Sequence, residues 1–142
     1  MFFHEKTYDI DELARHNLHI HTRFSTCAKP EMIAADIVRT AEKCGLEMIA
    51  LTDHNYIQKK NAVAQQRYDI LRELKNVETS VKVLVGAELS AYGIGKFADN
   101  ITSDNSLDYR LYTINHYHQS YWEHPEVKSP RAYAEHMLAI VD

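Results

Sequence analysis

Histidine and acidic side chains occur along the chain at spacings that suit metal-ion chemistry, beginning with the pair His19 and His21. Side chains two residues apart on an extended strand point to the same face, roughly 6.5–7 Å apart along it. Two imidazoles placed in this way can converge on one ion, each at about 2.0–2.1 Å. A His-x-His pair also arises by chance, so on its own it is only a weak indication of a metal site.

Three later stretches of the sequence offer groups suited to metal binding or proton transfer. Asp53 and His54 are adjacent and could orient a ligand or transfer a proton, although a turn Asp beside an exposed His is the simpler alternative. Glu88 could bridge two cations, as carboxylates do in binuclear hydrolytic sites, or could be an ordinary surface residue. His116 and His118 repeat the first spacing, and we favour His116 as the ligand because it directly follows an apolar stretch.

These side chains lie at or near the C-terminal ends of segments that have the character of β-strands. Such segments are short and apolar, and the third is rich in β-branched residues. They cover residues 17–22, 48–52, 81–87 and 111–115. Periodic apolar residues predict helices from Pro30 to Gly45, over 61–74 and over 130–141. Residues 89–110 are expected to form a long irregular loop, and no two strands are expected to form a hairpin.

The alternation of strands and helices predicts right-handed crossovers and a parallel sheet, so the predicted fold class is α/β. In parallel sheets and barrels of this class, active sites form at the C-terminal edge of the strands. Chance placement is a poor account of four strands that each deliver a metal-capable side chain to this edge. The sequence therefore predicts a metal site there.

The composition limits the classes of function. With 142 residues the chain has the size of one domain, and we treat residues 1–142 as a single domain. Its formal charge of −4, from 16 Lys+Arg against 20 Asp+Glu, argues against broad capture of nucleic acid by charge. No apolar run of about 18 residues offers a membrane span, and no signal-peptide apolar region follows Met1. Two cysteines fit a reducing cytoplasm, where we expect the protein.

Three motifs, taken in order, resemble those of the polymerase-and-histidinol-phosphatase (PHP) superfamily. They are His19-Ile20-His21-Thr22, Leu51-Thr52-Asp53-His54-Asn55 and Gly86-Ala87-Glu88. The stretch from Pro30 to Leu46 also resembles the helix that those proteins carry between their first two motifs. The resemblance spans about residues 17–118, and three motifs in the right order are far more specific than any one of them.

This resemblance implies a distorted (β/α)7 barrel with two or three divalent ions, of Zn, Mn or Fe, at its C-terminal rim. Members are mostly phosphoesterases, and some domains accompany bacterial replicative polymerases. Mapped onto this sequence, His19, His21 and Glu88 would hold one ion. Glu88 would bridge to a second ion that also takes His116.

The resemblance further implies that His54 contributes to a third ion site, with Asp53 as its support; these two are the predicted catalytic residues. Two departures from the family pattern matter. Where the family usually places an Asp or His after its His-x-His, this chain has Ser25-Thr26-Cys27, and Cys27 could be a soft ligand for Zn²⁺ or an inert small residue. The chain also shows about four of the seven expected strands, so we expect the N-terminal part of the barrel, without its C-terminal strands and motifs.

Metal-dependent hydrolysis of a phosphoester, by a phosphatase or a phosphodiesterase acting on a small phosphorylated substrate, is the function that these features predict. Two alternatives stay open. The first is a catalytically incomplete metal-binding or interaction module that self-associates through an exposed sheet edge. The second is a nuclease or polymerase-associated PHP domain that acts on nucleic acid, which the net charge does not favour.

Overall fold

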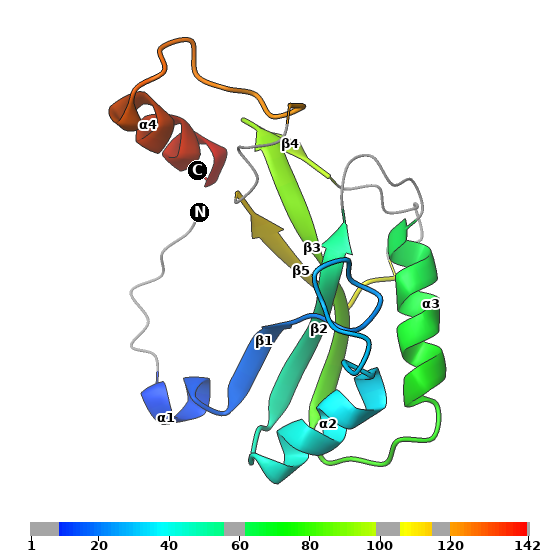
Figure 1. Cartoon of the computed structure of the whole chain (residues 1–142). Coiled ribbons are helices and arrows are strands. Elements are labelled where there is room, and N and C mark those ends of the chain that lie inside the picture. Colours follow the sequence, from blue (N-terminus) through cyan, green and yellow to red (C-terminus); the bar gives the residue numbers. More distant parts are fainter. Residues whose placement is uncertain (1–8, 56–61, 99–105, 115–119, 142) are drawn as a thin grey trace.

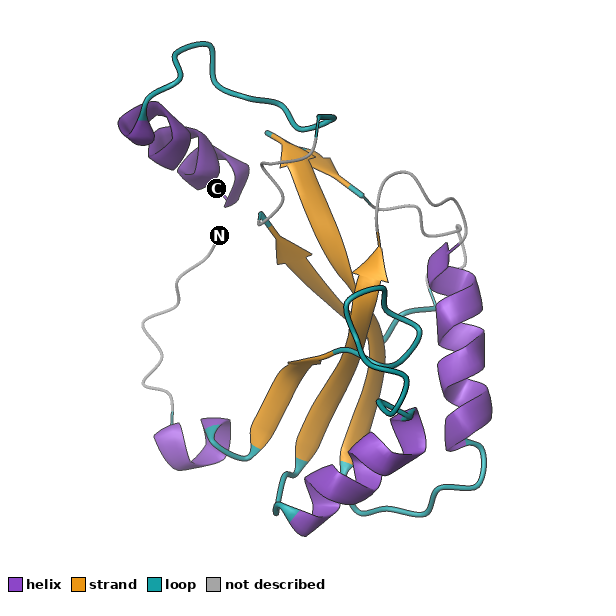
Figure 2. Cartoon of the chain, viewed as in Figure 1, coloured by secondary structure: helices purple, strands orange, loops and turns teal. Residues whose placement is uncertain are grey.

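A computed structural model describes residues 9–55, 62–98, 106–114 and 120–141 of the chain (Figure 1). Four parallel strands lie side by side in the order β1-β2-β3-β5. They are β1 (His16–Ile20), β2 (Met48–Asn55), β3 (Lys82–Gly93) and β5 (Tyr109–Thr113). Figure 2 shows that they form a curled sheet, as in a partial (β/α) barrel. The predicted α/β class and parallel sheet are thus confirmed.

Two helices cover one face of this sheet (Figure 1). They are α2 (Ala34–Lys43) and α3 (Ala62–Leu74). Val38 of α2 and Ile70 of α3 pack in one buried cluster with Ile49 and Leu51 of β2 and Val85 of β3. Burial of these apolar side chains is the main force that holds the helices on the sheet.

The side chains in this cluster define which face of each strand is turned toward the helices. Side chains alternate between the two faces along a strand. Since Leu51 and Val85 pack under the helices, His54 and Glu88, three residues further along each strand, belong to the opposite face. Ile20 of β1 packs against the same cluster. The histidines on either side of Ile20 therefore also belong to the face away from α2 and α3.

The region expected to be an irregular loop after residue 88 begins with regular structure, and that expectation is wrong. Strand β3 continues to Gly93 and turns back through a two-residue connection into the antiparallel strand β4 (Lys96–Phe97), so the expectation that no two strands form a hairpin is also wrong. Gly95 has a φ of 66°, a left-handed conformation that glycine adopts at no steric cost. The buried Ala91 packs with Trp122 and Ile140, and burial on both faces explains why no apolar alternation marked this part of the strand.

The remaining helices differ from the expectation mainly at one boundary. Helix α2 begins at Ala34 rather than at Pro30: the Ile33 carbonyl accepts the first helical hydrogen bonds, from Asp36 and Ile37, while the Met32 carbonyl accepts the Arg23 backbone N–H. A short helix α1 (Ile10–Leu13) precedes β1, and α4 (Pro130–Val141) forms as expected. Within the described residues, no helix combines the length and the apolar character needed to cross a membrane.

Candidate metal centre

The C-terminal ends of β1, β2 and β3 bring four of the predicted site residues together on one face of the sheet. His54 and Glu88 are register partners on the neighbouring parallel strands β2 and β3. His19 lies near the end of β1, and His21 directly follows that strand. Parallel strands all end at the same edge, so residues far apart in the sequence meet there.

One carboxylate oxygen is the centre of this group. Oε2 of Glu88 lies 3.1 Å from Nε2 of His19, 2.9 Å from Nε2 of His21 and 3.0 Å from Nδ1 of His54. The Glu88 side chain is 1% exposed, whereas that of His19 is 49% exposed. The carboxylate of the group is therefore buried, and the side of the group formed by His19 is open to solvent.

The electrostatics of the group favour an ionised Glu88 carboxylate beside a neutral His21 imidazole. Burial by itself would raise the pKa of Glu88, but hydrogen bonds and charge from His54, with further hydrogen bonds from Thr113 and His19, lower it to about 2. Burial lowers the pKa of His21, and the nearby His54 lowers it further. At neutral pH Glu88 is thus a carboxylate, and His21 is in the neutral form that can present a lone pair to a metal.

The donor atoms have the spacing that a shared cation requires. Two donors bound to one ion at about 2.0–2.1 Å lie about 2.8–3.4 Å apart when the bonds meet near 90–110°. The His19 and His21 Nε2 atoms are 3.0 Å apart, and their distances to Glu88 Oε2 are 3.1 and 2.9 Å. All three separations fall in this range. The residues present therefore fit a divalent cation bound by His19, His21 and Glu88.

Asp53, one of the two predicted catalytic residues, lies outside this group. Its Oδ1 accepts the Thr22 backbone N–H at 2.6 Å, and its Oδ2 accepts the Thr22 hydroxyl at 2.5 Å. Burial raises the pKa of Asp53 to about 6, although the Thr22 hydrogen bonds oppose the rise. Asp53 thereby ties β2 to the residue that follows His21. Its predicted role in proton transfer stays a prediction.

Three hydroxyl side chains support the site, and the sequence reasoning did not single them out. They are Thr22, which bonds Asp53; Thr113 of β5, which bonds Glu88; and Ser25, which accepts the His54 backbone N–H at 3.4 Å. Thr22 and Ser25 are buried, although both lie in the polar stretch after β1. A hydroxyl residue next to a predicted ligand is the signal that could have identified Thr22.

Cys27 lies against the same cluster, from the loop after β1. Its sulfur is 2.8 Å from Nδ1 of His21 and 3.5 Å from Oγ of Ser25. Together with His21 and His54 it forms a second group of donors that could hold a cation. The two predicted histidines at 116 and 118 lie outside the described residues.

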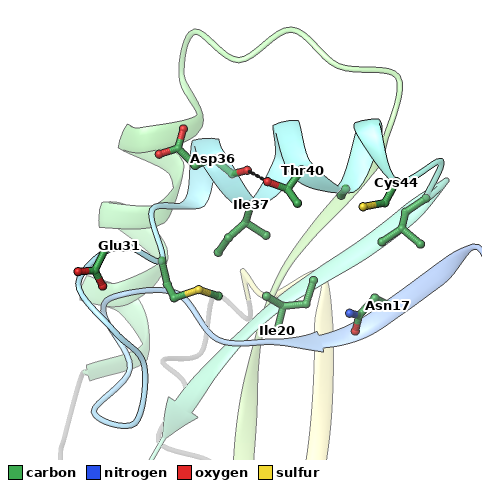
Figure 3. A pocket seen from close by; sticks show the side chains of 10 residues that line it. Asn17, Ile20, Glu31, Asp36, Ile37, Thr40 and Cys44 are labelled. Carbon is green, nitrogen blue, oxygen red and sulfur yellow. Dashed lines mark hydrogen bonds between the residues drawn. The ribbon is translucent and has the colours of Figure 1, made fainter.

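A separate apolar groove of about 360 Å³ lies between β1 and α2 (Figure 3). Ile20 and Ile37 line it, and Cys44 lies at one end. Ile20 faces this groove, whereas its neighbours His19 and His21 face the Glu88 group. None of the donor residues of the candidate metal centre lines the groove.

Comparison with known proteins bears on this arrangement. A family model described as "PHP domain" matches residues 17–141 of the chain. The match includes every residue of the candidate metal centre. No curated protein matches the chain significantly.

Proposed function

The chain belongs to the PHP domain family, and from that premise we propose that it hydrolyses a phosphoester with divalent cations bound at the Glu88 group. The observation that supports this proposal best is the convergence of three imidazoles from β1 and β2 on one buried carboxylate oxygen of β3. An ordinary structural ion pair needs one partner for a buried glutamate. Three imidazoles around one carboxylate oxygen suit a bound cation much better, because imidazole nitrogens and carboxylate oxygens are common ligands of Zn²⁺.

The bound cations would lower the pKa of an attacking water toward about 7 and neutralise the phosphate oxygens. The chain's own residues supply the rest. Glu88 gives the negative charge that fixes the cation's place, and His21 and His54 shield that charge from water. His19, which is half exposed, forms the side of the group open to a substrate.

We assign Asp53 a positioning role in this reaction. Both of its carboxylate oxygens are engaged by Thr22, so it does not reach the Glu88 group. Fixing Thr22 also fixes the direction in which the preceding residue, His21, presents its ring. Orienting contacts of this kind commonly contribute about 10–100-fold to metal affinity.

A small phosphorylated molecule is the substrate class that we propose, with the cytoplasm as the place of action. The cations, rather than lysines, would attract the phosphate to a chain whose formal charge is −4. A second candidate is a metal-binding module without turnover. The observation that favours it is that β1 pairs only with β2 within the described part of the sheet. The other side of β1 is therefore an edge with which another chain could pair.

Metal content and turnover, measured on the same preparations, test the proposal. The full chain is stripped with a chelator, reloaded with Mn²⁺ or Zn²⁺, and assayed by elemental analysis and by hydrolysis of p-nitrophenyl phosphate. Glu88→Gln removes the anionic ligand while keeping its size, and Glu12→Gln removes an exposed carboxylate of α1 as a matched control. We expect Glu88→Gln to bind the cations at least about tenfold more weakly and to lose turnover, and Glu12→Gln to behave as the wild type.

Each other outcome counts against a defined part of the proposal. Unchanged stoichiometry in Glu88→Gln would show that this carboxylate is not a ligand. Less than one equivalent of metal in the wild type, with no turnover, would favour the binding module. Hydrolysis of oligonucleotides without hydrolysis of small phosphomonoesters would replace the proposed substrate class with nucleic acid.

A further inference from the structure

The connection between β1 and α2, residues 21–33, is anchored to helix α3 at two points. Gln66 donates a hydrogen bond to the Phe24 carbonyl at 3.3 Å. Two turns further along the helix, Glu73 forms an ion pair with Arg23, in which Oε1 lies 2.5 Å from Nη2. Positions seven residues apart lie on the same side of a helix. One side of α3 therefore holds this connection.

The Glu73 carboxylate also contacts the first turn of α2. Its Oε2 accepts the backbone N–H of Ala34, the first residue of that helix, at 2.7 Å. The first N–H groups of a helix have no partner within the helix, and the N-cap residue Ile33 has an apolar side chain that cannot supply one. A negative charge at this end of a helix is also favourable to the helix dipole. One carboxylate of α3 thus fixes both Arg23 and the beginning of α2, near the two ends of the connection.

The packing of α3 on the sheet comes from its apolar side chains and does not need a carboxylate at Glu73. Ile70 and Leu74 of the same helix pack in the apolar cluster. The Glu73 side chain is 9% exposed, and that of Arg23 is 40% exposed. A buried ion pair is often no more stabilising than apolar side chains of similar size, because taking charges out of water is costly. What the pair does supply is a fixed place for the residue that lies two positions after His21.

We propose that the ion pair between Glu73 and Arg23 is a positioning device of the candidate metal centre, which holds His21 beside Glu88 before a cation binds. This inference rests on the proposed metal-dependent function. The backbone N–H of Arg23 donates to the Met32 carbonyl at 2.8 Å, so the connection is closed at the same point. A shift of Arg23 would move the backbone that carries the His21 ring. A site whose ligands are held in advance loses less conformational freedom on binding, and its affinity is higher for that reason.

Glu73 acts in this proposal through Arg23 and not as a ligand. Both of its oxygens are engaged, one by the Arg23 guanidinium and the other by the Ala34 backbone. A glutamine in its place has one acceptor oxygen and one NH₂ group, which only donates. Glu73→Gln therefore keeps the size of the side chain but leaves one of its two partners without an acceptor.

The cation affinity of the folded full chain tests the proposal. Chelator-stripped protein is titrated with Mn²⁺ and, separately, with Zn²⁺ in competition with a fluorescent chelating indicator, and the cation that the wild type binds more tightly is used for the comparison. The variants are Glu73→Gln, Arg23→Gln and the double variant. The control is Asp69→Asn, because the partners of this α3 carboxylate, Gln65 and Arg72, lie on the same helix.

We expect each single variant to bind the cation about tenfold more weakly than the wild type. The double variant should bind no more weakly than either single variant, because the two residues act as one unit. Asp69→Asn should bind as the wild type does. Wild-type affinity in a folded Glu73→Gln or Arg23→Gln would overturn the proposal, and so would additive losses in the double variant, which would show that the two residues act separately.

A further variant and a second measurement distinguish positioning from a purely structural role. Arg23→Lys keeps the positive charge and should recover most of the affinity that Arg23→Gln loses. The free energy of unfolding is measured by urea denaturation in a chelator on the same preparations. A lower free energy of unfolding with unchanged cation affinity would show a purely structural pair and refute the proposal. Should Glu73→Gln not fold, the two Arg23 variants decide alone, and equal affinity in both would overturn the positioning role.

Turnover of p-nitrophenyl phosphate, measured on the same preparations, separates this inference from the proposed function. If the wild type is active and Arg23→Gln raises KM without weakening cation binding, Arg23 contacts the substrate and only the positioning role is wrong. If the wild type binds the cation without turnover, and the Glu73 and Arg23 variants weaken binding as expected, the positioning role stands and the hydrolase proposal fails. If the wild type binds neither Mn²⁺ nor Zn²⁺, both proposals fail.

Discussion

The buried carboxylate of Asp53 makes the stability of the fold depend on pH. Its pKa is raised from the ordinary 3.8 to about 6, with burial as the largest cause. A group whose pKa is higher in the folded state holds its proton more tightly there than in the unfolded chain. Its contribution to stability is therefore complete below pH 3.8 and is lost as the pH rises through about 6.

The size of this effect follows from the two pKa values. A tenfold change in proton affinity corresponds to about 1.4 kcal/mol, so the rise from 3.8 to about 6 corresponds to about 3 kcal/mol. Asp53→Asn keeps the shape of the side chain and cannot ionise. Its amide can accept the Thr22 backbone N–H and donate to the Thr22 hydroxyl, so the two existing contacts are preserved. The variant should then lack this part of the pH dependence.

Urea denaturation with a metal chelator present, at pH 4 and at pH 8, measures the difference. The free energy of unfolding of the wild type, relative to that of Asp53→Asn, should fall by about 2–3 kcal/mol between the two pH values. Asp11→Asn, which removes an exposed carboxylate of α1, serves as the control and should follow the wild type. The same pH dependence in the wild type and in Asp53→Asn would refute the reasoning and show that Asp53 is not held at a raised pKa.

Three further substitutions test other contacts of the fold and site. Thr22→Val removes one of the two hydrogen bonds to a buried carboxylate and should lower the free energy of unfolding by about 1–3 kcal/mol, whereas Thr22→Ser should restore most of it in urea denaturation. Gly86→Ala places a methyl group against the carbonyl oxygen of Tyr109 and should cost about 1–3 kcal/mol by overpacking; unchanged stability would show that β3 and β5 can separate easily. His116→Ala should reduce metal content more than His118→Ala, and equal losses by elemental analysis would contradict our choice between them.

The class of the fold could be predicted because the composition of strand β2 and of the first part of β3 is typical of buried strands. Residues 48–52 and 81–87 are apolar segments separated by a helical pattern, which is how a parallel sheet covered by helices is encoded. The continuation of β3 to Gly93 was not predictable by the same means. Its residues mix polar, small and bulky side chains without alternation, and they belong to the sheet because they pair with β4 and β5 and because Ala91 packs against Trp122 and Ile140.

The sequence allowed us to predict which residue types gather at the candidate site, but not which of the two neighbours Asp53 and His54 lies beside Glu88. The ends of the predicted strands indicated that His19, His21, His54 and Glu88 would lie together, because side chains alternate along a strand and parallel strands share one C-terminal edge. The opposite orientation of Asp53 and His54 also follows from that alternation. Which of these two side chains joins the Glu88 group depends on which face of the sheet α2 and α3 cover. The identities of Asp53 and His54 do not indicate which face that is.

The charge of Glu88 is what holds the cluster together. Burial without partners would make this carboxyl group protonate more easily, yet its pKa is lowered to about 2 because His54, Thr113 and His19 outweigh the effect of burial. Contacts from β1, β2 and β5 therefore all depend on one charge on β3. Groups that share one partner do not contribute additively, so the loss of one histidine leaves the remaining donors to compensate. Loss of Glu88 removes the common partner of all of them, which makes Glu88→Gln a sharper test of the site than any single histidine variant.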